Sequence, residues 1–419
     1  MGRIGRVGRV GRIRRSGKLG RLEKGCTEQR LNGKAVYRKA AEHGSGATQK
    51  RRNAEAIKPL QDWVCHDNSA MTLPPSTADL PRAFAKPALL PPQAYSGTVQ
   101  LGHLGVIKAV GEDAATFLQG QLTQEISTMS LNEARLAAFC NAKGRMQASF
   151  VVFKRKNESN GDDVLMVCSQ DLLAQTLKRL SMFVMRAKVK LSDASAEFSL
   201  YGLCGDAADT VQATILGAAC ARIHWSKSDI DAANVIQLYP GAGVARSLWC
   251  APSAAAPPQG EPLPLATWQY LEVQSGIAMI TLPIFEAFVP QMLNYESVGG
   301  VNFKKGCYPG QEVVARSQFR GTLKRRAYLV QTAGTPGAEV FIGQEVFQTS
   351  DAEQPCGLVA ACAVYPAGGF ALVVSMQTAA AAAHDLATAK KEASPLRLGS
   401  SGGPALDLQS LPYLLLEDI

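Results

Sequence analysis

Alternation between apolar and polar positions predicts a mixture of short strands and helices from residue 97 onward. β-branched residues punctuated by glycine predict short strands over 98–110. Two apolar runs, 134–140 and 146–154, flank Asn141-Ala142-Lys143-Gly144, whose composition is typical of a hairpin turn. Further strands are predicted at 163–168, 188–191 and 197–203. Antiparallel hairpins of this kind favour an α+β fold over regular βαβ repeats.

Helical spacing appears in two later segments. Apolar residues from Leu173 to Val184 recur at i, i+4, i+7 and i+11, which predicts a helix that Ser169 can cap. Pro264 can open a second helix that ends before Gly276. Short β runs separated by glycine and proline between residues 325 and 374 are typical of a small barrel. The alanine-rich tract that follows is expected to be helical or an insertion.

The length of 419 residues exceeds what one hydrophobic core usually spans, so two or three folded units with disordered ends are expected. No run of about eighteen uncharged apolar residues occurs, which argues against a membrane span. We divide the chain into a disordered basic tail (1–70), a Pro-rich lead-in (71–96), an α+β body (97–322) and a C-terminal β-barrel-like domain (323–419).

Basic charge is concentrated in the tail. Residues 1–70 contain 17 Lys and Arg against 6 Asp and Glu, whereas the remaining residues hold 27 against 29. The tail places arginine at every third position from Arg3 to Arg12, and it could contact RNA phosphates or act as a transit peptide. The alternative is a floppy segment, or a misassigned start with Met71 as the natural beginning. Because the rest of the chain is nearly neutral, we expect no direct nucleic-acid binding there.

Cysteine usage indicates a reducing environment. The ten cysteines are scattered and form no C-x-x-C pair, which favours free thiols and a cytoplasmic protein. The closest two, Cys356 and Cys362, are separated by five residues in a predicted barrel segment. We therefore expect no self-contained metal or cluster site.

Residues 302–316 gather several specialised side chains around Cys307. The pair Pro309-Gly310 suits a type II turn, because proline pre-sets the first central φ and glycine accepts the positive second one. The run 311–320 contains no breaker and predicts a short helix whose amino end lies near the sulfur. That helix end and Lys305 would favour the thiolate. The alternative for a free cysteine is an inert, buried apolar side chain.

The motif Lys305-Gly306-Cys307-Tyr308-Pro309-Gly310-Gln311-Glu312 resembles the K-G-C-Y-x-G-Q-E signature of the YgfZ family. These proteins are folate-binding relatives of the glycine-cleavage T-protein that support iron–sulfur proteins. The flanks 288–294 and 299–303 also resemble that family, and the likeness extends from about Gly97 to the C-terminus. It implies a T-protein-like body, a C-terminal barrel, and an accessory role in iron–sulfur cluster assembly or repair that indirectly supports tRNA modification.

The resemblance also implies roles for particular residues. Cys307 would be a reactive thiol and Lys305 would keep it reactive. The remaining motif residues would shape or brace the turn: Gly306, Tyr308, Gly310, Gln311, Glu312 and Arg316. Contacts to tetrahydrofolate or a related folate would come from Gln274, which replaces a glutamate of the family's E-A-G element, and from Lys143 and Arg145. For these two bases, ordinary solvation of a hairpin turn is the alternative.

The second candidate function is a folate-dependent aminomethyltransferase of the T-protein type. T-proteins carry an acidic side chain beyond the equivalent hairpin, and here no carboxylate follows Gly144 until Glu158. The group that general acid–base catalysis needs is therefore missing from this stretch. We expect an accessory factor rather than an enzyme, with folate and iron–sulfur proteins or their assembly factors as partners.

Overall fold

A computed structural model describes residues 71–72, 95–157, 161–216, 223–319, 323–333, 339–366 and 368–416, all within a unit formed by residues 63–419. The predicted basic tail and most of the lead-in lie outside the described residues. The described parts of the lead-in are residues 95–96 and β1 (Met71–Thr72), which pairs antiparallel with β13 (Glu339–Val340).

The first sheet of the body is antiparallel, with five strands in the order β4-β5-β6-β3-β7. Their bounds are Leu104–Val110 (β3), Ala134–Cys140 (β4), Met146–Arg155 (β5), Asp163–Ser169 (β6) and Lys190–Asp193 (β7). The β4–β5 hairpin predicted around residues 141–144 is confirmed. Both faces of β5 are buried, with Phe150 and Val152 in one apolar cluster and Val151 and Phe153 in another. Burial on two faces explains why this strand reads as a continuous apolar run.

The second sheet has the order β2-β8-β11-β10-β9. Its strands are Gly97–Gln100 (β2), Phe198–Cys204 (β8), Lys227–Ile230 (β9), Ala233–Gln237 (β10) and Arg246–Pro252 (β11). Helix α4 (Leu265–Gln274) packs closely on this sheet, because a Cβ added at Gly202 of β8 would collide with the ring of Trp268. The remaining helices of the body are α1 (Ala114–Gln119), α2 (Gln170–Ser181), α3 (Asp206–Leu216) and α5 (Gln311–Phe319), with short 3₁₀ turns η2 (Leu282–Ile284) and η3 (Pro290–Leu293).

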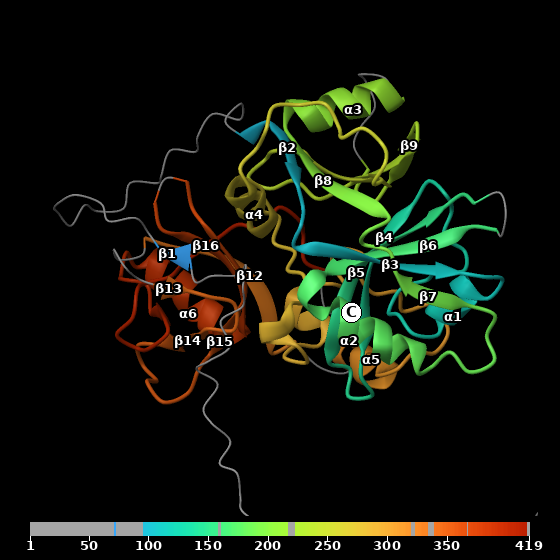
Figure 1. The fold of residues 1–419 in the computed structure, drawn as a ribbon. Coiled ribbons are helices and arrows are strands. Elements are labelled where there is room, and N and C mark those ends of the chain that lie inside the picture. The colour runs from blue at the N-terminus through green and yellow to red at the C-terminus, as the bar shows by residue number, and fades with distance from the viewer. Residues whose placement is uncertain are drawn as a thin grey trace, which may run out of the picture. The chain divides into compact units, whose positions relative to one another are not determined.

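The C-terminal sheet, orange to red in Figure 1, has six strands in the order β17-β14-β15-β16-β12-β18. They span Arg325–Thr332 (β12), Glu345–Gln348 (β14), Gly357–Val364 (β15), Phe370–Gln377 (β16), Leu396–Leu398 (β17) and Asp407–Gln409 (β18). Residues 404–406 pair with β17, and β18 directly after them pairs with β12. The sheet thereby curls into a half-barrel, which agrees with the predicted β-barrel-like domain. The alanine-rich tract forms α6 (Thr378–Ala389).

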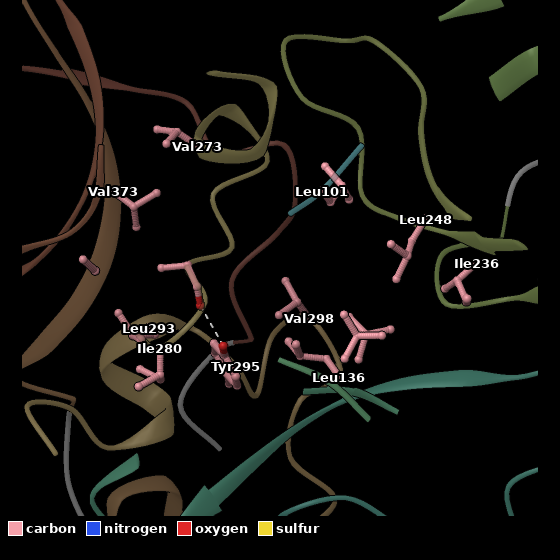
Figure 2. Packing of buried hydrophobic residues seen from close by; sticks show 14 of the residues in the cluster. Leu101, Leu136, Ile236, Leu248, Val273, Ile280, Leu293, Tyr295, Val298 and Val373 are labelled. Carbon is pink, nitrogen blue, oxygen red and sulfur yellow. Dashed lines mark hydrogen bonds between the residues drawn. The ribbon is translucent and has the colours of Figure 1, made fainter. Parts of the chain in front are cut away.

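One apolar cluster contains side chains from all three large sheets. Figure 2 shows part of it around Tyr295, whose hydroxyl donates a hydrogen bond to the Ala278 carbonyl at 2.7 Å. Leu136 of β4 and Val373 of β16 belong to the same cluster. No helix among the described residues is long and apolar enough to cross a membrane.

Two helix predictions need correction at their ends. Helix α2 stops at Ser181, before Val184, and the Ser169 hydroxyl bonds to Asp171 rather than capping a backbone amide. Pro264 occupies the position before the first residue of α4 rather than the first position itself.

Candidate functional site

The turn beside Cys307 has the predicted type II geometry. The Gln311 amide donates to the Tyr308 carbonyl at 3.2 Å, and Gly310 takes a φ of +80°. Helix α5 begins directly after this turn, at Gln311, as predicted. The backbone conformation near the sulfur is therefore defined by the local sequence Tyr-Pro-Gly.

The same turn rests on the β4–β5 hairpin. A Cβ added at Gly310 would collide with the Asn141 carbonyl oxygen and lie 2.6 Å from the Gly144 Cα atom. Gly144 in turn faces Val313 of α5. Only glycine permits backbones to approach this closely, so the cysteine motif and the hairpin turn form one structural unit.

Lys305 is buried and caps a helix. Its Nζ donates to the carbonyls of Gln119 at 2.6 Å and Leu122 at 2.9 Å, at the C-terminal end of α1, where a cation is favoured. The ammonium also lies 4.5 Å from the centre of the Tyr308 ring. Burial lowers the pKa of Lys305 to about 8, while the neighbouring Glu125 and Cys307 oppose this shift. Lys305 is therefore a structural cation whose charge also acts on the Cys307 sulfur.

Cys307 itself is exposed, as is Gly306. The other motif side chains take different roles: Tyr308 is buried, whereas Glu312 and Arg316 form an exposed ion pair of 2.6 Å with each other along α5. An exposed ion pair contributes little to the stability of the fold. Because both residues lie on α5, the pair acts on the helix and not on the turn. Of the described cysteines, Cys140, Cys168, Cys204, Cys250 and Cys356 are buried, and burial raises the pKa of each thiol, to about 12 for the first four.

A cavity that is partly open to solvent lies between the two sheets of the body. Strands β4 and β5 contribute Leu136, Ser149 and Val151, and the end of α4 contributes Glu272 and Ser275. Aromatic and apolar side chains from other segments complete the lining: Trp225, Leu238, Tyr239, Ile277, Ala278, Met279 and Tyr295, together with Arg246.

Arg246 and Glu272 are the charged groups of this lining. The Arg246 side chain is 97% buried, and its guanidinium stacks over the Trp268 ring at 4.4 Å. The Arg246 Nε has no hydrogen-bond partner among the described residues. Glu272 lies 3.7 Å from Arg246 and 4.0 Å from His103, distances too long for direct hydrogen bonds. Burial lowers the pKa of Arg246. The cavity thus presents an unsatisfied donor next to a carboxylate that retains free acceptor sites.

The sequence-predicted folate contacts lie outside this lining. Gln274 is on α4 but Glu272 and Ser275 of that helix face the cavity instead. Arg145 donates through its guanidinium to the Ala287 carbonyl, and Lys143 is exposed on the hairpin turn. Cys307 is also absent from the lining. Of the two segments expected to contact folate, α4 borders the cavity through Glu272, whereas no residue of the hairpin turn 141–144 lines it.

A carboxylate near the hairpin was missed by sequence reasoning. Glu286, between η2 and η3, accepts a hydrogen bond from the side-chain amide of Gln147, two residues into β5. Its distance from the hairpin along the chain hides this contact in the sequence. The sequence indicates Arg246 and Glu272 only weakly. Glu272 is the only charged residue of α4, and Arg246 is the only charged residue of β11. No group of three or more metal-ligating side chains gathers in the described part of the chain.

No protein-family model matches the chain. Over 342 residues it is 26% identical to the tRNA-modifying protein YgfZ of Yersinia enterocolitica, covering 80% of this chain and 97% of that protein. Over 343 residues it is 27% identical to the Yersinia pestis protein of the same name, covering 79% and 98%. The solved glycine cleavage system aminomethyltransferase T from Bartonella henselae superimposes with a TM-score of 0.52 at 15% identity, over 77% of this chain and 89% of that one. This structural likeness confirms the T-protein-like fold.

Proposed function

We propose, from the premise that this chain belongs to the YgfZ family, that it is a folate-binding accessory protein for iron–sulfur cluster assembly or repair. The Yersinia relatives are named tRNA-modifying proteins, and we assign this chain an indirect part in that process, through enzymes that carry clusters. Its partners would be the folate and iron–sulfur proteins or their assembly factors.

The observation that carries the folate assignment is the Arg246–Glu272 pair in the cavity. The pyrimidine edge of a pterin presents an amino group and a ring N–H as adjacent donors, with a carbonyl oxygen beside them. Glu272 can accept from the two donors, and the unpartnered Nε of Arg246 can donate to the carbonyl. Tyr239 and Trp225 line the cavity and offer apolar faces to a planar ring.

The exposed thiol suits a second task at a separate place. Cys307 stands on a rigid turn, accessible to a macromolecule, while the cavity is lined by other residues. We assign to the thiol a transient contact with a cluster, a redox partner or a client protein. The hairpin that packs on Gly310 also supplies cavity residues from β5, so ligand and thiol share one supporting element.

A binding titration with tetrahydrofolate under anaerobic conditions tests the cavity assignment. Glu272→Gln keeps the side-chain size but replaces one charged acceptor by an amide, so affinity should fall roughly 10- to 100-fold, the range for a hydrogen bond to a charged group. Gln274→Glu is the matched variant on the same helix and should leave affinity unchanged. Absence of binding by the wild type, or equal affinity of Glu272→Gln and wild type, would overturn the assignment.

The alternative function, folate-dependent aminomethyl transfer, is favoured by one observation. Glu286 places beside the hairpin a carboxylate that the local sequence lacks. A turnover assay supplies tetrahydrofolate and an aminomethylated carrier protein and measures ammonia release. Turnover by wild type that is lost in Glu286→Gln would replace the accessory role by the enzymatic one.

A further inference from the structure

Residues 411–416, which we call the C-terminal strap, follow β18 and lie against the body of the protein. Tyr413 packs on the large apolar cluster, whereas the next side chain, Leu414, is 92% exposed. At the end of the strap, the Leu416 amide donates to the Ser297 hydroxyl at 2.9 Å. A segment held by one face and by its end opens locally at a lower free energy than the core strands do.

The Tyr413 hydroxyl joins the strap to a wall of the cavity. It donates to the Gly276 carbonyl at 2.8 Å and accepts from the Asn294 side-chain amide at 3.3 Å. Gly276 lies between Ser275 and Ile277, which both line the cavity. Burial raises the pKa of Tyr413, so the hydroxyl stays protonated at neutral pH and keeps its hydrogen bond to the wall.

The Tyr413 ring supports a second part of the lining. It lies edge-on to the ring of Tyr239, with 5.8 Å between the ring centres and an angle of 80° between the planes. Aromatic pairs in this arrangement attract each other beyond the effect of burial alone. Tyr239 lines the cavity, and the ring of His224 stacks on it at 4.1 Å. Tyr413 and His224 together therefore hold the orientation of a ring that a ligand would contact.

The wall itself depends on side-chain contacts for its position. Residues 275–281 lie outside any helix or strand, so no backbone ladder holds them. The Tyr295 hydroxyl donates to the Ala278 carbonyl at 2.7 Å (Figure 2), and the Ile280 amide donates to the Ser149 hydroxyl at 2.8 Å. The strap supplies the corresponding hydrogen bond at the other end of this segment, where α4 has just ended.

We propose that Tyr413 is a positioning residue of the cavity, and that docking of the C-terminal strap and ligand binding stabilise each other. The inference rests on the folate-binding function proposed above and adds the part of the chain that regulates the same site. Tyr413 is not part of the lining, so it acts through Tyr239 and Gly276, which it holds in the shape that the ligand contacts. A ligand in the cavity favours the docked strap in turn, because coupling between two sites is reciprocal.

Hydrogen–deuterium exchange of the ligand-free protein tests whether the strap holds the wall. Tyr413→Phe keeps the ring and removes the hydroxyl, and ending the chain after Ser410 removes the whole strap. The peptide covering 275–281 should exchange roughly 2- to 10-fold faster in Tyr413→Phe, as the loss of a neutral hydrogen bond implies, and at least as fast in the shortened chain. Leu414→Ala changes the exposed face of the strap and should leave the exchange of this peptide unchanged. Equal exchange in wild type and the shortened chain would overturn the proposal.

Titration with tetrahydrofolate under anaerobic conditions tests the coupling. Ending the chain after Ser410 should weaken binding by roughly 5- to 150-fold, the usual range for coupled sites. Reciprocity then requires that saturating tetrahydrofolate slow the exchange of peptide 411–416 in wild type by the same factor. A strap that only added to the overall stability of the fold would not show this match, because its amides exchange by local opening.

The outcomes separate this inference from the function on which it rests. Failure of wild type to bind tetrahydrofolate would reject the folate-binding function, and the ligand-free exchange rates would then decide the role of Tyr413 by themselves. Full affinity in the shortened chain, or a strap whose exchange the ligand does not slow, would reject the coupling and leave the folate-binding function standing. Thermal unfolding checks the fold of each variant. If the shortened chain does not fold, Tyr413→Phe keeps the test decisive, since its affinity should fall roughly 2- to 10-fold.

Discussion

The geometry of the cysteine motif depends on the close approach of Gly310 to the β4–β5 hairpin turn. Gly310→Ala should disrupt this approach. The new methyl group would collide with the Asn141 carbonyl oxygen and lie 2.6 Å and 2.7 Å from the Gly144 Cα and N atoms. These are backbone atoms at the tip of a hairpin, so they cannot rotate away as a flexible side chain can. The residue must also keep a φ of +80°.

The magnitude follows from these two effects. Placing alanine in the left-handed region costs about 1–2 kcal/mol. Forcing the hairpin turn away from α5 adds about 1–3 kcal/mol, the usual cost of overpacking. We therefore expect Gly310→Ala to lower the free energy of unfolding by about 2–5 kcal/mol, against a typical total of about 5–15 kcal/mol.

Urea denaturation followed by tryptophan fluorescence measures this change. Gly306→Ala is the matched control in the same motif, because a Cβ at residue 306 meets no atom within 4 Å and the residue is not among those with positive φ. Its free energy of unfolding should stay within about 0.5 kcal/mol of wild type, as for other surface substitutions. Equal stability of Gly310→Ala and wild type, or equal losses for both variants, would refute the reasoning.

Three further predictions concern Lys305 and a buried ion pair. Lys305→Met removes a cation that acts on the Cys307 sulfur. Below pH 8, iodoacetamide should therefore alkylate Cys307 more slowly in this variant than in wild type, as measured by mass spectrometry of the Cys307 peptide. Equal alkylation rates at pH 7 would contradict this prediction. Burial lowers the pKa of Lys305 from 10.5 to about 8, so between these pH values the unfolded chain binds more protons than the folded chain. The free energy of unfolding of wild type should therefore rise with pH relative to that of Lys305→Met, as measured by urea unfolding at pH 7.5 and 9.5. A parallel pH response of both proteins would count against this prediction. Arg326→Met leaves the fully buried Glu296 carboxylate without its partner at 2.7 Å and should cost about 3–5 kcal/mol in guanidinium unfolding. The exposed Arg316→Met should cost less than about 1 kcal/mol, and similar losses in the two variants would argue against the role of burial.

Features that depend on neighbouring residues could be predicted from local sequence. Pro309-Gly310 specified a type II turn, and the breaker-free run after it became α5. The composition of residues 141–144 specified the β4–β5 hairpin, because turn residues and flanking apolar runs act within a few positions of each other. The α+β class and the C-terminal β-barrel-like domain followed from the same local patterns.

Which side chains share a site depends on how distant segments pack against one another. Glu286 meets Gln147 across 139 positions of chain, and Arg246 meets Glu272 between a strand and a helix. Likewise, Lys305 proved to cap α1 rather than serve the thiol alone. Such contacts depend on how sheets and helices pack, and packing is set by the complementarity of whole surfaces rather than by the residues next to each charge. Local sequence therefore defined the turns and strands, whereas the folding of distant segments onto one another placed the acceptors and donors of the cavity.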